Sequence, residues 1–248
     1  MPKTQTAQAP LAQAQADLRS EHVIVSNAGL NSLRAAVLGA NDGIVSVSSI
    51  ILGVAGAGVS RTAIFTAGMA GLAAGALSMA VGEYVSVSSQ RDTERAYIVE
   101  EKMHLAEFPD AEFADLARTF ERKGLTPATA RKVAEELTAH DAVAAHLDAE
   151  FNLNEKDLSN PFIAAISSLI AFTVGGIIPL AVVMLAGASV RLLAVALGVI
   201  IALTVTGYLS ATAGHAPRLR AIGRVIVGGI LAMAITYGIG RLFGHFVS

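Results

Sequence analysis

The chain has 248 residues, of which 53% are hydrophobic and only 15% carry a formal charge, and its net charge is −2. A mean hydropathy of +0.57 is too high for an ordinary soluble domain of this length, so the composition predicts an integral membrane protein. The absence of cysteine excludes disulfides, zinc–thiolate sites and iron–sulfur clusters. Any bound metal must therefore be held by carboxylate, imidazole, thioether or backbone oxygen ligands.

The N-terminal segment, residues 1–33, is polar and rich in glutamine and alanine. It has no basic start that leads directly into an apolar core, so we expect no cleavable signal peptide. The segment is expected to be flexible, and the first apolar run would act as its own insertion signal.

Five apolar runs are about as long as the ~20 residues that a helix needs to cross a bilayer. Two precede a polar middle segment and three follow it, at residues 34–58, 62–89, 161–187, 190–213 and 219–246. The runs are too long for barrel strands, and a lipid-exposed backbone must satisfy its own hydrogen bonds. The predicted fold class is therefore all-α, a polytopic membrane protein with two transmembrane helices in residues 34–90 and three in residues 159–248.

The distribution of arginine predicts the orientation of these helices. The connection between the fourth and fifth spans carries Arg218, Arg220 and Arg224, whereas the loops after the first and third spans carry one arginine each. Cytoplasmic loops are enriched in Lys and Arg, so the N-terminus and the polar middle segment should be cytoplasmic.

Two acidic residues interrupt the first pair of spans. Asp42 is the only charged side chain between residues 35 and 60, and Glu83 is the corresponding exception in the second span. Met79 lies four residues before Glu83 and therefore on the same helical face. A carboxylate inside a bilayer costs several kcal/mol unless it has a partner or ligand, so the two acids and the thioether predict a cation site.

The polar middle segment, residues 91–158, is called the insert below. It holds sixteen acidic and nine basic residues, so its net charge is −7 while the rest of the chain carries +5. Its pattern predicts three helices: residues 91–108 continuing the second span, residues 111–123, and a third from Pro127 to Glu150. Pro109 separates the first two, and Thr126 before Pro127 fits a helix N-cap.

The insert also presents pairs of candidate metal ligands at helical spacing. Residues three or four positions apart on a helix share a face. Such charged faces usually belong to a solvated amphipathic bundle, but the membrane acids nearby favour a metal-binding role. The pairs are Glu101 with His104, Glu112 with Asp115, and His146 with Glu150.

Four segments carry a resemblance to a known family. They are residues 33–46 (LRAAVLGANDGIVS), 71–92 (GLAAGALSMAVGEYVSVSSQRD), 160–165 (NPFIAA) and 175–180 (GGIIPL). They resemble the vacuolar iron transporter family in its bacterial branch, and the likeness covers nearly the whole chain from about residue 31. It implies a homodimer with five membrane helices per subunit and a cytoplasmic metal-binding domain, residues 91–158. It also implies export of Fe²⁺ or Mn²⁺ from the cytosol in exchange for protons, across a bacterial inner membrane.

The resemblance extends to single residues. Asp42 and Met79 match the translocation-site acid and methionine of the family, and Glu83 lies one helical turn further on. The six insert positions match the family's metal ligands, but His104, Asp115 and His146 differ from the usual residue types. Imidazole still binds ferrous, manganous and zinc ions, so the resemblance implies an altered site at which Zn²⁺ is also a candidate.

The sequence leaves several functions open. It has no Gly-x-x-x-x-Gly-Lys-Ser/Thr run for ATP binding, so we expect a transporter driven by a gradient, with no enzymatic activity, prosthetic group or nucleic-acid partner. A membrane-anchored metal sensor or interaction protein and a passive divalent-cation channel are the alternatives. A carboxylate-bridged di-iron enzyme would need paired Glu-x-x-His motifs, and Glu101 with His104 supplies only one in the insert.

Overall fold

The computed structural model describes residues 27–214 and 216–247, with side chains for residues 35–212, 214 and 216–244. This part of the chain contains seven helices and no strand, which confirms the all-α class. Five of the helices are long and apolar enough to cross a membrane, as predicted. These five are α2 (Asn27–Gly56), α3 (Arg61–Glu107), α6 (Pro161–Leu185), α7 (Arg191–Ala213) and α8 (Arg218–Val247). The expected flexibility of the N-terminal segment concerns mainly residues that lie outside the described part, although α2 already begins at Asn27.

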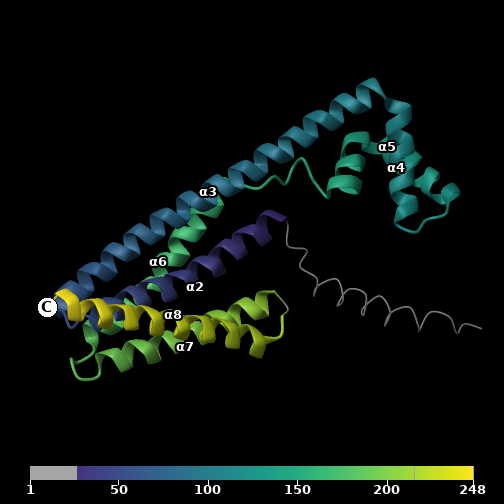
Figure 1. The fold of residues 1–248 in the computed structure, drawn as a ribbon. Coiled ribbons are helices and arrows are strands. Elements are labelled where there is room, and N and C mark those ends of the chain that lie inside the picture. Colours follow the sequence, from purple (N-terminus) through teal and green to yellow (C-terminus); the bar gives the residue numbers. More distant parts are fainter. Residues whose placement is uncertain (1–26, 215, 248) are drawn as a thin grey trace, which may run out of the picture.

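Helix α2 is the centre of the membrane bundle. It packs against α3, α6, α7 and α8, and α6 is its most extensive neighbour (Figure 1). Its side chains Ile44, Val47 and Ile51 are buried among apolar residues of the other four helices, including Phe172 of α6 and Leu203 of α7. Asp42 therefore lies one turn from the packed core of the bundle.

Glycines allow the closest approaches of α2 to its neighbours. A Cβ atom at Gly43 would lie 2.1 Å from the Phe172 carbonyl oxygen, and one at Gly175 would lie 2.3 Å from the Ala40 carbonyl oxygen. The backbones of α2 and α6 thus touch where any larger residue would force them apart, which is the small-residue packing of membrane helices.

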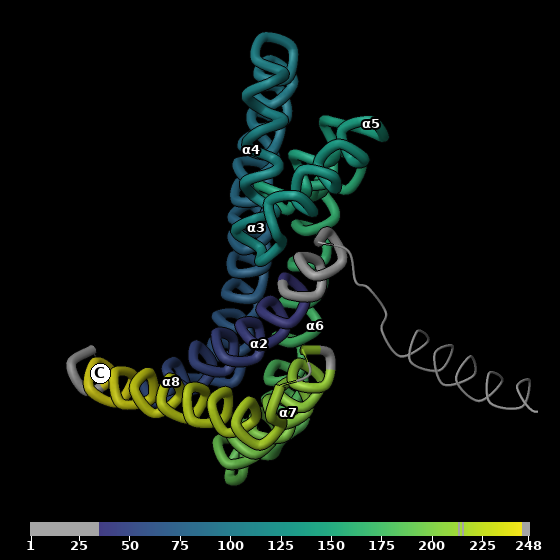
Figure 2. The backbone as a smooth tube through the Cα atoms, turned by 90° about the vertical axis from the view of Figure 1, so that its right-hand side faces the viewer, coloured from purple at the N-terminus to yellow at the C-terminus, as the bar shows by residue number. Residues whose placement is uncertain are grey.

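Helix α3 is a single unbroken helix of 47 residues. At 1.5 Å per residue it is about 70 Å long, more than twice the thickness of a bilayer core of about 30 Å. Ser60 caps its N-terminus, where its hydroxyl accepts a hydrogen bond from the Ala63 amide at 3.2 Å. Figures 1 and 2 show α3 extending from the membrane bundle to the insert, as the predicted continuation of the second span requires.

The rest of the insert contains α4 (Pro109–Arg122) and α5 (Pro127–Phe151). Helix α5 begins at Pro127 as predicted, whereas α4 begins at Pro109, two residues before the predicted start at residue 111. The Thr126 hydroxyl caps α5 by accepting from the Thr129 amide at 3.4 Å. One feature was not predicted: Asp141 has non-helical backbone angles and kinks α5. Its carboxylate accepts a hydrogen bond from the Ala144 amide at 3.0 Å, so it caps a new helical segment within α5.

Candidate metal centre

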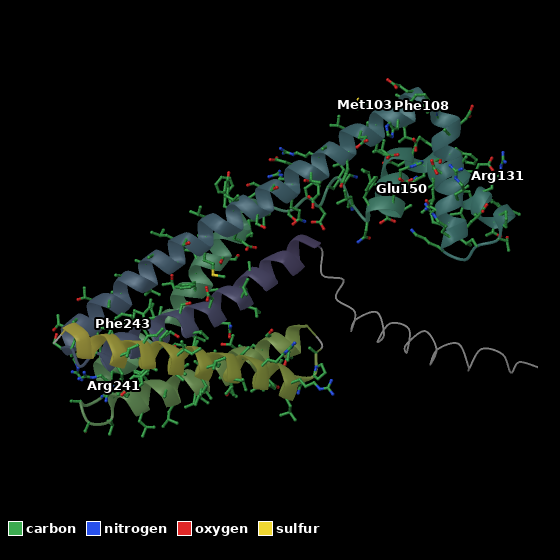
Figure 3. The ribbon with its side chains drawn as sticks, viewed as in Figure 1. Met103, Phe108, Arg131, Glu150, Arg241 and Phe243 are labelled. Carbon is green, nitrogen blue, oxygen red and sulfur yellow. The ribbon has the colours of Figure 1, made fainter. Side chains whose placement is uncertain are left out.

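The insert brings four of the predicted ligands together from three helices. Glu101 comes from α3, Glu112 from α4, and His146 and Glu150 from α5. His146 and Glu150 both follow the kink at Asp141, so the capped second part of α5 directs them towards α3. Figure 3 shows Glu150 in this part of the insert, well away from the membrane bundle.

The His146 imidazole is at the centre of this cluster. Its Nδ1 atom lies 3.0 Å from Glu101 Oε1, 3.2 Å from Glu150 Oε1 and 3.8 Å from Glu112 Oε2. Ligand atoms of Glu101, Glu112 and His146 all lie within 4.8 Å of one another. Donor atoms that share one ion through bonds of about 2.1 Å lie about 3–4 Å apart, so small side-chain adjustments would suffice to bind a cation.

Burial makes this arrangement costly without a positive charge. The His146 side chain is fully buried and that of Glu101 is 5% exposed. His146 Nε2 is buried and makes no hydrogen bond to any group in the described part of the chain. Glu101 Oε1 is also buried, and although it lies 3.0 Å from His146 Nδ1, the hydrogen bond of that nitrogen goes to Glu150. Buried carboxylates that lack hydrogen bonds are strongly disfavoured, whereas a bound divalent cation would compensate them, so this donor set fits a metal ion.

Two predicted insert ligands occupy the edge of the cluster or lie outside it. The His104 side chain is about half exposed, and its Nδ1 atom lies 3.6 Å from Glu112 Oε1. Asp115 accepts a hydrogen bond of 2.6 Å from Arg118 and its side chain is half exposed. The structure therefore brings Glu101, Glu112, His146 and Glu150 together, places His104 beside them, and pairs Asp115 with a neighbouring arginine instead.

The predicted membrane residues lie on two adjacent helices. Asp42 of α2 is half-buried and accepts a hydrogen bond of 2.9 Å from the Ser46 hydroxyl. Met79 of α3 packs against the apolar core, and Glu83 is half-buried one turn further along the same helix. Asp42 and Glu83 are therefore both partly shielded by the bundle, and neither is fully buried.

One buried acid of α3 was not predicted as a site residue. Glu94 is only 9% exposed, although Asp92, Thr93 and Arg95 around it are exposed. The spacing in the sequence indicated this position, because Glu94 lies eleven residues after Glu83 and seven before Glu101. Both spacings are close to whole numbers of helical turns, so the three acids share one face of the helix.

We expect Glu112→Gln to weaken cation binding by the insert roughly tenfold to a hundredfold, the scale at which loss of a carboxylate affects a metal site. Asp115→Asn is its matched control, since it removes one negative charge one turn away on the same helix and should change affinity less than about twofold. Calorimetric titration of the full chain in detergent with Co²⁺ measures both. Equal weakening would mean that overall negative charge, and not the cluster, binds the ion.

Cation binding should also strengthen as the pH rises. Burial raises the pKa of the Glu101 carboxyl above its ordinary 4.5; His146 opposes this shift and the Glu150 and Glu112 carboxylates add to it. The folded state holds the Glu101 proton more tightly than the unfolded state does. The contribution of this proton to the free energy of unfolding is therefore complete below pH 4.5 and is lost as the pH rises through the raised pKa. A cation needs the deprotonated form, so its affinity should rise over the same range.

The measurement is a Co²⁺ titration and a thermal melt of the full chain at several pH values above 4.5. Glu101→Gln removes the titrating group, and the difference between it and the wild type isolates the contribution of Glu101. Identical pH profiles for the two proteins would contradict the prediction.

Comparison with known proteins gives a consistent relationship. The model of the VIT family matches residues 33–241. The chain is 42% identical over 215 residues to a vacuolar iron transporter of Acanthamoeba castellanii, covering 85% of this chain and 78% of that protein. It is 38% identical over 214 residues to vacuolar iron transporter homolog 5 of Oryza sativa, covering 86% and 81%. It is 34% identical over 215 residues to vacuolar iron transporter homolog 2 of Arabidopsis thaliana, covering 86% and 85%. With its five spans and this extent of similarity, the chain belongs to the VIT family.

Proposed function

We propose that this protein carries Fe²⁺ across a membrane, from the compartment that the insert faces to the opposite side, in exchange for protons. The observation that carries the proposal is α3, one unbroken helix that bears Glu101 of the cation cluster at one end and Met79 and Glu83 within the bundle. The relatives named as vacuolar iron transporters support iron as the cargo. If the insert is cytoplasmic, as the arginine distribution predicts, this is export from the cytosol.

The donor set suits ions of intermediate hardness. Carboxylates accept Mn²⁺ and Fe²⁺, and a buried imidazole adds affinity for Fe²⁺ and Zn²⁺. We therefore propose Mn²⁺ as a second cargo and Zn²⁺ as a further ligand of the insert. The net charge of −7 on the insert would raise the local concentration of any divalent cation.

Proton exchange follows from the position of the membrane acids. A cation bound to Asp42 or Glu83 offsets the cost of an anionic carboxylate in a medium of low dielectric constant. When the cation leaves on the far side, a proton taken up from that side neutralises the same oxygen atoms. Return of the proton to the first side would restore the carboxylate for the next ion.

We also propose that the transporter is a homodimer. The apolar segments of α3 and α8 that could span a membrane have only 22% and 11% of their residues buried within one chain, and of these two helices α3 carries the candidate ligands Met79 and Glu83. A second copy packed there would exclude lipid from the cation path. The relatives come from an amoeba and from plants, and the bacterial inner membrane expected from the sequence stays a prediction.

The test is uptake into proteoliposomes that contain a pH-sensitive dye, with Fe²⁺, Mn²⁺, Zn²⁺ and Ca²⁺ compared. We expect uptake of Fe²⁺ with proton movement in the opposite direction. Metal uptake without proton movement would favour the passive channel. Cation binding by the protein with no uptake would overturn transport and favour a membrane-anchored sensor.

A further inference from the structure

Glu94 is a buried carboxylate in the part of α3 that belongs to the insert. The Gln90 carboxamide donates a hydrogen bond of 2.8 Å to Glu94 Oε1. The other oxygen, Oε2, is buried and has no hydrogen-bond partner within the described part of the chain. No ion pair is seen there between Glu94 and a basic side chain, Arg91 three residues earlier included.

The position of Glu94 along α3 relates it to both cation sites. At 100° per residue, Glu83, Glu94 and Glu101 lie within about 20° of one line along the helix. Glu94 is about 10 Å from Glu101 and about 16 Å from Glu83 along the axis. It therefore lies on the same face as both acids and between them.

The chain that returns from the insert to the membrane contacts α3 on both sides of Glu94. Phe151 at the end of α5 stacks on Tyr97, with ring centroids 4.8 Å apart, and Phe162 at the start of α6 meets Tyr84 edge-on at 5.1 Å. The segment between them, residues 152–161, therefore joins two points of α3 that lie on either side of Glu94 along the helix, and within it Glu155 pairs with Lys102 of α3 at 2.7 Å. Figure 1 shows this segment returning beside α3. Glu94 is thus a buried acid beyond the apolar span, in the stretch of α3 beside which the chain returns.

We propose that Glu94 is a transit site, at which a divalent cation pauses on its way between the insert cluster and the acids of the membrane bundle. This inference rests on the proposed function and adds a residue to its path. Gln90 is the positioning residue, because its hydrogen bond holds Oε1 and leaves Oε2 available to bind the ion. One carboxylate binds a partly hydrated cation weakly, and weak binding suits a site from which the ion must leave.

The burial of Glu94 supports this role over a purely structural one. A buried carboxylate with one unsatisfied oxygen weakens the fold unless something compensates it, and a passing cation does so. A glutamine at this position would keep the shape and the hydrogen-bonding capacity without the charge. If Glu94 served only the fold, this exchange would leave transport unchanged.

The experiment measures Fe²⁺ influx into proteoliposomes that contain calcein, with ascorbate to keep the iron ferrous. Four full-length proteins are compared: wild type, Glu94→Gln, Glu94→Asp and Glu100→Gln. Glu100 is the matched control, because it is an exposed acid of the same helix about 120° away from the line of Glu83, Glu94 and Glu101. Co²⁺ titration and thermal melting of each protein in detergent are measured in parallel.

We expect Glu94→Gln to lower the initial rate of influx roughly tenfold or more, the scale on which loss of a carboxylate affects a metal site. Glu100→Gln should stay within about twofold of the wild type, and Glu94→Asp, which keeps the charge, should retain much more of the rate than Glu94→Gln. Co²⁺ binding by the insert and the melting temperature should not fall in Glu94→Gln.

Two results would overturn the inference and leave the proposed function standing: a wild-type rate in Glu94→Gln, or a loss of rate accompanied by weaker Co²⁺ binding or a lower melting temperature. A wild-type protein that moves no Fe²⁺ would overturn the proposed function itself.

Discussion

Replacing Asp42 with asparagine is expected to reduce Fe²⁺ flux roughly a hundredfold while the insert still binds Co²⁺ normally. A central carboxylate costs about 3 kcal/mol on membrane-insertion scales. If the attraction of a cation offsets a cost of this size, its loss corresponds to roughly a hundredfold in binding. Asparagine keeps the shape of the side chain and can still accept the hydrogen bond from Ser46. The loss of flux would therefore come from removal of the negative charge.

Ser46→Ala is the control for this experiment. It removes the hydroxyl that donates to Asp42 Oδ1 at 2.9 Å and keeps the carboxylate. Because the negative charge that would attract the ion stays in place, flux should fall by clearly less than in Asp42→Asn if the carboxylate itself binds the ion. Flux at the wild-type rate in Asp42→Asn would remove this residue from the path.

The largest expected effect on stability is that of Gly240→Ala. A Cβ atom at Gly240 would lie 1.8 Å from the Gly53 carbonyl oxygen, so α8 and α2 would have to separate. Overpacking of this kind costs about 1–3 kcal/mol or more. For a chain of this size we expect the melting temperature in detergent to fall by roughly 5–10 °C. Figure 3 labels Arg241 and Phe243, which lie close to Gly240 in the sequence, near the C-terminal end of α8.

Gly238→Ala offers a matched comparison on the same helix. No atom lies within 4 Å of a Cβ placed at Gly238, so the added methyl group meets open space. Alanine is favoured over glycine in a helix by about 1 kcal/mol, and the melting temperature should stay the same or rise. If both variants lowered the melting temperature equally, close packing between α2 and α8 would not be the cause.

The membrane helices were predictable because a bilayer imposes one length and one kind of surface. Apolar runs of about 20 residues can form only helices there, and all five were found. The start of α5 was also predictable, because proline lacks only the N–H donor that the first position of a helix does not need. The same property lets α4 begin at Pro109 itself, where the sequence predicted a break and a helix from residue 111. Thr126 supplies the cap that fixes the start of α5.

The remaining features depend on contacts between segments distant in the sequence. Asp115 has helical spacing to Glu112, but Arg118 one turn on competes for its carboxylate, and spacing cannot decide between the two partners. The Asp141 side chain can either stay on the surface of a continuous helix or cap a new helical segment. Packing of the second part of α5 against the other helices decides between the two, and the sequence around Asp141 does not show it. Glu94 has exposed neighbours in the sequence and looks like a surface acid, and only the packing of the folded chain buries it.

The length of α3 has a mechanical consequence. A rigid rod about 70 Å long that tilts by 5° displaces its far end by about 6 Å. A bilayer thinner than the hydrophobic length of the spans makes helices tilt, so membrane thickness would be transmitted to the top of α3, where Met103 and Phe108 lie (Figure 3). The lipid around the bundle would thereby set the distance between the insert and the bilayer surface. Energy transfer between a dye on the insert and a dye at the bilayer surface would measure this distance in bilayers of different thickness.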